Sequence, residues 1–318
     1  MAYFDLFNGD ADGICALIQL RKDQPRNATL VTGVKRDINL LARVDAAPGD
    51  QITVLDVSMD KNSAALEKVL AQDAQVFYVD HHFPGDIPDH PNLTAIINES
   101  PDVCTAALVN GHLKGAYLDW AVTGAFGDNL KDTARSLAKP LDLSAGDLLS
   151  LEQLGTYINY NGYGPSIADL HFDPEDLYRK LYLAESSLEF VHSSADFAKL
   201  SDGYRDDMGQ AEQLQPNHVT EKVAVFSLPD EAWARRVSGV YSNDLATGNP
   251  DRAHAVLTQK SNGNYLVSVR APMSNKQGAA QLCMQFPTGG GRAAAAGIND
   301  LPVDSLDAFV EAFELAYK

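Results

Sequence analysis

Residues 76–85 contain polar side chains that packing alone does not explain. An apolar run of strand-forming residues ends abruptly in Asp80, His81 and His82, and a Pro-Gly pair then turns the chain. An aspartate is seldom buried without a partner, and a metal ion is an effective partner for a carboxylate beside imidazoles. The stretch therefore predicts a metal site at the end of a buried strand.

Further aspartates follow two other expected strands. Asp10 and Asp12 lie in a glycine-rich turn behind the first strand, and Asp56 follows the third. The carboxyl ends of parallel strands lie along one edge of a sheet, where α/β proteins bind their ligands. Neighbouring strands would thus bring these three carboxylates and His81 to one site. Each aspartate alone could instead cap the following helix, but the complete set favours metal binding.

Asp128 is a candidate fourth carboxylate, because it lies in an apolar segment of small residues that reads Gly-Ala-Phe-Gly-Asp-Asn. The alternative for this residue is a structural role in a hydrogen-bond network. Lys35 and Arg36 could face the same crevice or the solvent, and we expect them to face the solvent.

A glycine-rich segment near the carboxyl end is a candidate phosphate cradle. Gly289, Gly290 and Gly291 precede Arg292 and a run of alanines, so that backbone N–H groups, a helix N-terminus and a guanidinium could face an anion. The alternative is a tight turn with an exposed arginine. Arg270, at the end of an expected strand, is a second candidate anion contact.

The elements that must position these residues follow the order of an α/β protein. We expect a doubly wound, mainly parallel sheet in the N-terminal domain and a smaller α/β domain at the C-terminus. Expected strands are residues 2–7, 29–33, 51–55, 76–79, 94–97, 222–227, 253–259 and 265–270. Expected helices are residues 14–20, 38–43, 62–70, 117–139, 148–158, 174–183, 232–245 and 277–284.

The bulk composition is that of a globular protein large enough for two domains. The chain has 318 residues, of which 45% are hydrophobic and 21% charged, and its formal net charge of -18 argues against sequence-independent binding to long duplex DNA. No signal peptide or membrane span is expected. The three separated cysteines indicate buried thiols in a reducing compartment, and hence a cytoplasmic protein.

Taken together, the motifs resemble those of the DHH phosphoesterase superfamily. The likeness rests on Asp-x-Asp-Gly after the first strand, a strand-end aspartate, Asp-His-His and a Gly-x-x-Gly-Asp segment. The later Gly-Gly-Gly-Arg-x-x-Ala-Ala motif is similar to the glycine-rich motif of DHHA1 substrate-binding domains. Such an organisation would place the DHH domain at residues 1–195, a connecting helix and linker at 196–217, and the DHHA1 domain at 218–318.

The resemblance implies two Mn²⁺ ions, with Mg²⁺ as an alternative metal. Asp10 and Asp56 would hold one ion, and Asp12, Asp56, His81 and Asp128 the other. As catalytic residues, His82 would lie near the scissile phosphate and Asp80 would orient the histidine pair.

The chain departs from the family pattern at three positions. Leu6 stands where many members have histidine, and Asn8 where RecJ-like members have aspartate, so the first metal lacks a ligand unless Asn8 supplies its amide oxygen. Arg292 replaces the usual histidine of the DHHA1 motif and can grip a phosphate bidentately.

The resemblance thus implies a Mn²⁺-dependent phosphoesterase, with a small phosphate or a short single-stranded nucleic acid as its partner. Short oligonucleotides or small nucleotide phosphodiesters are the expected substrates, with no membrane partner and with a homodimer as one possible assembly. Two alternatives remain open, a pyrophosphatase or polyphosphatase and a non-catalytic nucleotide-binding regulator.

Overall fold

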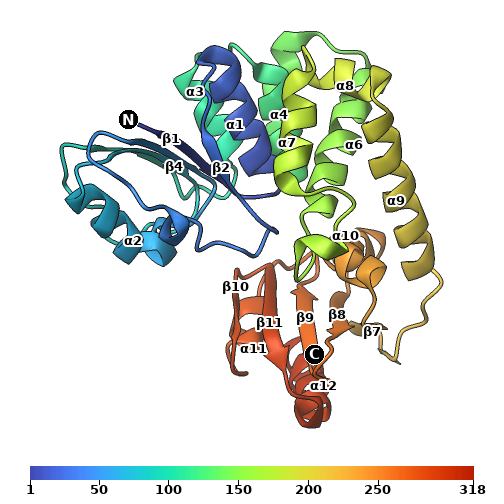
Figure 1. Ribbon diagram of the computed structural model, residues 1–318. Coiled ribbons are helices and arrows are strands. Elements are labelled where there is room, and N and C mark those ends of the chain that lie inside the picture. Colours follow the sequence, from blue (N-terminus) through green and yellow to red (C-terminus); the bar gives the residue numbers. More distant parts are fainter. The chain divides into compact units, whose positions relative to one another are not determined.

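The computed structural model describes all residues from 1 to 318 and divides them into two compact units (Figure 1). The first unit, Met1–Asp202, holds a parallel sheet and most of the helices, and the second, Gly203–Lys318, holds a mixed sheet. The expected fold class is therefore confirmed. The division falls within the segment 196–217 that was expected to connect two domains.

The sheet of the first unit contains five strands, all parallel, in the order β2-β1-β3-β4-β5. This order reverses direction between β1 and β3, and such a switch point opens a crevice beyond the carboxyl ends of the strands. The strands are β1 Tyr3–Phe7, β2 Thr29–Val31, β3 Gln51–Leu55, β4 Gln75–Asp80 and β5 Leu93–Ile97.

Helices cover both faces of this sheet, as the doubly wound class requires (Figure 1). Helix α2 (Met59–Ala71) lies on one face, and α1 (Ala11–Asp23) and α3 (Thr105–His112) lie on the other. The core beneath α2 includes Leu6, which is completely buried among aliphatic side chains. The position that carries histidine in many DHH proteins is therefore part of the hydrophobic core.

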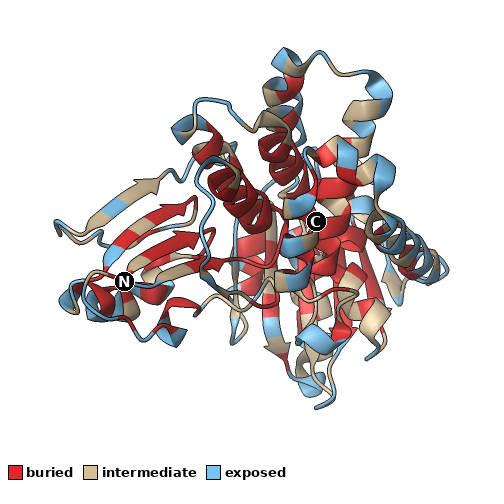
Figure 2. Ribbon diagram, turned by 45° about the horizontal axis from the view of Figure 1, so that its top comes forward, coloured by how far each residue is buried: buried red, intermediate tan, exposed pale blue.

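The helices that follow α3 form a bundle around α1, and the residues on their inner sides are buried (Figure 2). Helix α4 packs against both α1 and α6. A Cβ at Gly127 would lie 2.2 Å from the Cβ of Ala11, so glycine is needed for this close approach. The helices are α4 Leu118–Gly127, α5 Lys131–Ala138, α6 Ala145–Asn161, α7 Pro174–Leu183, α8 Ser187–Ser193 and α9 Ala195–Ala211.

The prediction of one helix over residues 117–139 is wrong, because the helix stops at Asp128 and α5 begins after it. Asn129 adopts a left-handed φ of 61°, which asparagine tolerates better than most residues. Leu130 N then donates to Ala125 O, and Asn129 N donates to Phe126 O. This Schellman motif holds Asp128 at the end of α4 rather than in a helix interior.

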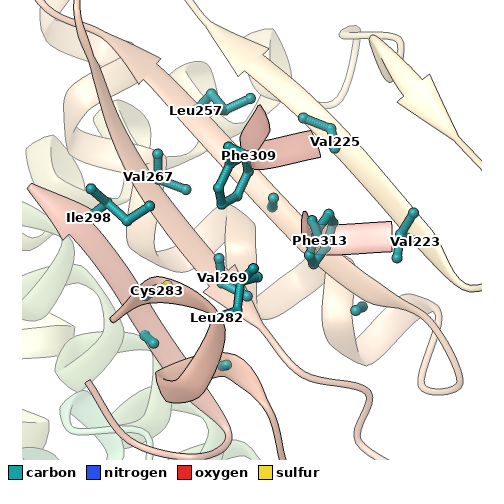
Figure 3. Close-up of a cluster of buried hydrophobic side chains, with 14 of the residues drawn as sticks. Val223, Val225, Leu257, Val267, Val269, Leu282, Cys283, Ile298, Phe309 and Phe313 are labelled. Atoms are coloured by element: carbon teal, nitrogen blue, oxygen red, sulfur yellow. The ribbon is translucent and has the colours of Figure 1, made fainter. Parts of the chain in front are cut away.

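The second unit is built on a six-stranded sheet in the order β10-β11-β9-β8-β7-β6, in which only β7 and β8 pair in parallel. Phe309 and Phe313 of α12 pack against valines and leucines of this sheet (Figure 3). The strands are β6 His218–Val219, β7 Val223–Leu228, β8 Ala253–Gln259, β9 Tyr265–Arg270, β10 Gly289–Gly291 and β11 Ala295–Leu301. The helices are α10 Ala232–Gly248, α11 Ala279–Cys283 and α12 Leu306–Ala316.

Two other local predictions are wrong. Residues 38–43 contain only the short 3-10 helix Leu41–Arg43, and no helix begins after Arg292. Gly291 instead pairs with Ala296 across a hairpin, because pairing with a neighbouring strand overrides the helix propensity of the alanine run. Helices α3, α8 and α12 and strands β10 and β11 were not expected. None of the helices combines the length and apolar character that a membrane crossing needs.

Candidate metal centre

The aspartates that follow β1 lie at the switch point of the sheet. Asp10 caps the N-terminus of α1, where its Oδ1 accepts hydrogen bonds from the backbone N–H groups of Asp12 (3.1 Å) and Gly13 (3.2 Å). A Cβ at Gly13 would lie 2.3 Å from the carbonyl oxygen of Asn8, which explains the glycine. Asp10 therefore caps the helix, and its role as a metal ligand stays a prediction.

Asp12 points from α1 toward the start of α3. Its two oxygens each accept one backbone N–H, Oδ2 from Thr105 and Oδ1 from Ala106, both at 2.7 Å. A helix N-terminus stabilises a carboxylate through these N–H groups. Asp12 is 1% exposed, so α3 fixes its orientation within the protein interior.

Asp56 follows β3 in a left-handed conformation with a φ of 57°, which is uncommon for residues other than glycine and is found at functional sites. Its Oδ1 accepts a hydrogen bond of 3.2 Å from the Thr105 hydroxyl, and its backbone N–H donates to Val79 O. The strained backbone is thus held from both sides.

His81 brings the carboxylates together around one imidazole nitrogen. Its Nε2 lies 3.4 Å from Asp56 Oδ1, 3.9 Å from Asp12 Oδ2 and 3.9 Å from Asp128 Oδ2. Nδ1 lies 2.8 Å from the carbonyl oxygen of Val103. Since a carbonyl only accepts, Nδ1 carries a proton, and Nε2 is the nitrogen that faces the carboxylates, where a metal ion would take the place of a proton.

His82 is held in a different way. Its Nδ1 donates to Asp80 Oδ1 at 2.8 Å, and Asp80 is completely buried. The side chain of His82 is 38% exposed, so its ring remains accessible beside the cluster. Ligand atoms of Asp56, His81 and His82 all lie within 4.8 Å of one another.

The electrostatics of the cluster show negative charge that the surrounding protein does not cancel. Burial and the neighbouring Asp12 and Asp10 hold the pKa of Asp56 well above its usual range, and burial raises that of Asp128. Burial lowers the pKa of His81, but its hydrogen bond to Asp56 and the nearby carboxylates outweigh this and raise it to about 10. Buried oxygen ligands with one imidazole suit Mn²⁺ or Mg²⁺, so these residues fit a divalent ion.

Lys35 does not face the solvent, and that prediction is wrong. Its Nζ lies 2.6 Å from Asp10 Oδ2 and donates to Asn159 Oδ1 at 2.7 Å. Although burial opposes it, the negative charge of Asp10 holds the pKa of Lys35 well above its usual range. Burial likewise opposes ionisation of Asp10, yet the Lys35 charge and hydrogen bond keep the pKa of Asp10 low.

Asn8 is buried beside this pair. Its Nδ2 donates to the carbonyl oxygen of Lys35 at 3.3 Å, whereas its Oδ1 has no hydrogen-bond partner. The structure therefore gathers all six residues expected as ligands in one region: Asn8, Asp10, Asp12, Asp56, His81 and Asp128.

Two free cysteines flank the cluster. Cys15 lies on α1 and Cys104 caps α3, and both side chains are completely buried. Burial raises the pKa of each thiol well above its usual range, and the charge of Asp12 adds to this effect. The sequence-based expectation of buried thiols is confirmed.

The expected anion contacts belong to the second unit. Gly289–Gly291 form the edge strand β10, where a Cβ at Gly289 would lie 1.8 Å from the carbonyl oxygen of Cys283. Arg292 is exposed, and Arg270 Nε donates to Asn243 Oδ1 at 2.7 Å. Their role in binding a substrate stays a prediction.

Of the groups that orient the carboxylates, sequence reasoning assigned Lys35 to the solvent and missed Asn159 and the N-terminus of α3. Lys35 follows β2, the neighbour of β1, so the rule that strand ends converge could have found it. The backbone N–H groups of Thr105 and Ala106 leave no such signal, because every residue except proline has one.

Comparisons with known proteins place the fold in a recognisable class. No protein-family model and no curated protein matches the chain. Solved structures do match over 99% of it, and they include RecJ from Thermus thermophilus in complex with Mn²⁺ and an exonuclease RecJ bound to manganese. The protein therefore has the fold of the DHH-family phosphoesterases, as its motifs predicted.

The particular similarities are as follows. RecJ from Thermus thermophilus matches with a TM-score of 0.68 and 18% identity, and the chain spans about half (51%) of its length. The manganese-bound exonuclease RecJ matches with a TM-score of 0.63 and 15% identity over 90% of its length. A pGpG-specific phosphodiesterase, PggH from Vibrio cholerae, matches with a TM-score of 0.56 and 15% identity over 99% of its length.

Proposed function

We propose that this protein is a metal-dependent phosphoesterase that hydrolyses short oligonucleotides or small nucleotide phosphodiesters. The observation that carries the proposal is the convergence of three buried or half-buried aspartates on His81 Nε2 at the switch point. Solved structures of similar fold include RecJ with Mn²⁺ or Mg²⁺ and a pGpG-specific phosphodiesterase, which supports this class of substrate.

Asp12, Asp56, His81 and Asp128 would hold the divalent ion, with Mn²⁺ as the preferred metal. A divalent ion there supplies Lewis acidity for phosphoryl oxygens and lowers the pKa of bound water. Because His81 Nδ1–H donates to the carbonyl oxygen of Val103, the ring is held with Nε2 toward the carboxylates.

His82 would act on the phosphate, and Asp80 would orient His82. Asp80 fixes the Nδ1–H tautomer of His82, so Nε2 is the atom available to a phosphate oxygen or to its proton. The partial exposure of His82 leaves room for a ligand beside the buried carboxylates.

The second unit carries the candidate anion contacts. Arg292 is exposed and could pair with a phosphate through two N–H groups, and Gly289–Gly291 form the edge strand that precedes it. Arg270 would be a further anion contact. The net charge of -18 favours short substrates over long duplexes.

The test is hydrolysis by the purified chain with Mn²⁺. We expect release of mononucleotides from short 5′-labelled oligomers, and Asp56→Ala should abolish both metal uptake and turnover. Asp60→Ala is a matched control, because Asp60 is an aspartate of the same segment whose side chain is 38% exposed on α2. Full turnover by the Asp56→Ala variant would contradict the proposal, and release of phosphate from pyrophosphate alone would redirect it to a pyrophosphatase.

One observation favours a second candidate, a non-catalytic nucleotide-binding regulator. Lys35 pairs with Asp10, which is a metal ligand in the pattern that the sequence resembles. Calorimetry that shows nucleotide binding, together with no hydrolysis of any phosphoester in the presence of metal, would favour this candidate.

A further inference from the structure

The first of the two implied metal positions contains a positively charged group of the protein itself. We propose that the Lys35 ammonium permanently takes the place of one of the two divalent ions, so that the chain binds one metal ion instead of two. The inference rests on the proposed function, because it presupposes that the remaining carboxylates hold a metal.

Lys35 is built into the site by contacts from several elements. Its Nζ contacts Asp10 Oδ2 and Asn159 Oδ1, its backbone N–H donates to Gly162 O at 2.8 Å, and its carbonyl oxygen accepts from Asn8. Nζ also lies 5.5 Å from the centre of the Tyr163 ring, within the range of a cation–π contact. A side chain anchored at both its backbone and its ammonium is not a mobile surface lysine.

The hydrogen bonds of Asp10 and Asp12 differ in a way that decides which carboxylate can bind metal. A carboxylate oxygen has about two lone-pair sites. Asp10 Oδ1 accepts two backbone N–H groups and its Oδ2 is engaged by the ammonium at 2.6 Å. Asp12 accepts only one N–H at each oxygen, so each retains a lone pair for a cation. Asp10 therefore retains one lone pair, on the oxygen that already contacts the ammonium, whereas Asp12 retains one on each oxygen and is the better ligand for a metal ion.

The other ligands of the first position are also altered. Leu6 is completely buried in the hydrophobic core and offers no ligand atom. Asn8 has a free Oδ1, but a neutral amide oxygen next to an ammonium is a poor substitute for a carboxylate. Two cations sharing Asp10 would repel each other across a buried space, where Coulomb energies are larger than in water.

The second position, by contrast, retains a complete set of ligands. Asp12, Asp56, His81 and Asp128 supply three carboxylates and one imidazole, and no lysine or arginine forms an ion pair with any of them. The chain thus pairs one protein cation with Asp10 and leaves one site for a divalent ion. Water activation would then depend on that ion alone.

Counting bound Mn²⁺ in the full chain tests the inference. We expect one ion per chain by equilibrium dialysis with elemental analysis, and the electron paramagnetic resonance signal of an isolated Mn²⁺. Two ions with an exchange-coupled signal would overturn the inference while leaving the proposed function intact. No bound ion would overturn both.

Variants of Lys35 and Asn8 test whether the lysine is what limits the chain to one metal ion. Asn8→Asp restores a carboxylate at the first position, and we expect this variant to bind one ion as long as Lys35 is present. The double variant Asn8→Asp/Lys35→Ala should bind two ions and show the exchange-coupled signal. Two ions in Asn8→Asp alone, or one ion in a folded double variant, would contradict a role for Lys35.

A matched control separates this effect from the loss of any buried lysine contact. Lys22 is also partly buried, and its Nζ donates to the carbonyl oxygens of Tyr182 and Ala184 rather than to a carboxylate. Lys22→Ala should leave the count at one ion. A second ion in this control would show that the count does not report on the first position, and would contradict the inference.

Discussion

The two ends of helix α1 both carry buried charges, but they treat them in opposite ways. At the C-terminal end, Arg21 Nε and Nη2 each contact one oxygen of Asp5 at 2.6 Å, and Nη2 also donates to Thr53 Oγ1 at 2.9 Å. At the N-terminal end, Asp12 meets Asp56, Asp128 and His81. We call the C-terminal end of α1 the closed end, because its buried charges pair with each other, and the N-terminal end the open end, because its carboxylates gather without an equal number of cations.

The difference shows what distinguishes a structural charge from a binding site. The Arg21–Asp5 pair is bidentate, nearly inaccessible and electrically balanced, so it can contribute to stability but has nothing to offer a ligand. In the acidic cluster, burial and mutual repulsion hold the pKa of Asp56 high. A divalent ion would offset this excess of negative charge, so unpaired charge is what marks the cluster as a candidate metal site.

The largest expected effect comes from removing the guanidinium that pairs with Asp5 at the closed end. Arg21→Met keeps most of the aliphatic stem but leaves Asp5 buried without a partner, which costs about 3–5 kcal/mol of unfolding free energy. Urea unfolding of the full chain measures this loss. Arg179→Met is the matched control, because Arg179 pairs with Glu175 at an exposed position and should cost less than about 1 kcal/mol. Equal losses in both variants would remove the distinction between the two ends.

Metal should next stabilise the open end. Mn²⁺ at a free concentration of about one hundred times its dissociation constant is expected to raise the unfolding free energy by about 2.7 kcal/mol, since it binds only the folded chain. Arg21→Met should show the same increment, whereas Asp12→Asn should lose it. An increment that survives in Asp12→Asn would place the metal elsewhere.

The smallest effect concerns the metal-free protein and its pH dependence. A carboxyl whose pKa is higher in the folded state favours folding below its unfolded pKa, and this contribution is lost as the pH rises through the folded value. Metal-free protein at neutral pH therefore carries a penalty at Asp56. Asp56→Asn should remove it and gain roughly 1–3 kcal/mol at about pH 7. The difference between the two proteins should shrink toward acid pH, and a constant difference from about pH 7 to about pH 4 would contradict this origin.

The positions of the candidate ligands were predictable because they obey a rule of topology. Asp10, Asp12, Asp56 and His81 each follow a strand, and parallel strands end along one edge whatever their side chains are. Asp128 was singled out as well, although its helix was misread, because a carboxylate is unusual in an otherwise apolar segment of small residues. Both signals, a polar residue after an apolar strand and an aspartate in an apolar segment, can be read from the local sequence.

What the sequence did not reveal depends on contacts between distant segments. Lys35 follows the edge strand β2, and the strand-end rule allowed it to face either the crevice or the solvent. Its contacts with Asn159 in α6 and with Gly162 just after that helix turn it inward. The N-terminus of α3 holds Asp12 through backbone groups that no sequence pattern marks. The alanines after Arg292 favour a helix locally, and pairing with β9 and β10 decides otherwise.

Cys15 and Cys104, sealed beside the acidic cluster, give the metal centre a built-in kinetic probe. Only the thiolate reacts with an alkylating reagent, so two fully buried thiols with raised pKa react only when α1 and α3 separate locally. Their alkylation rate would report the opening frequency of the site, and bound metal would slow it. Cys283, buried in the other unit, provides an internal reference in the same molecule.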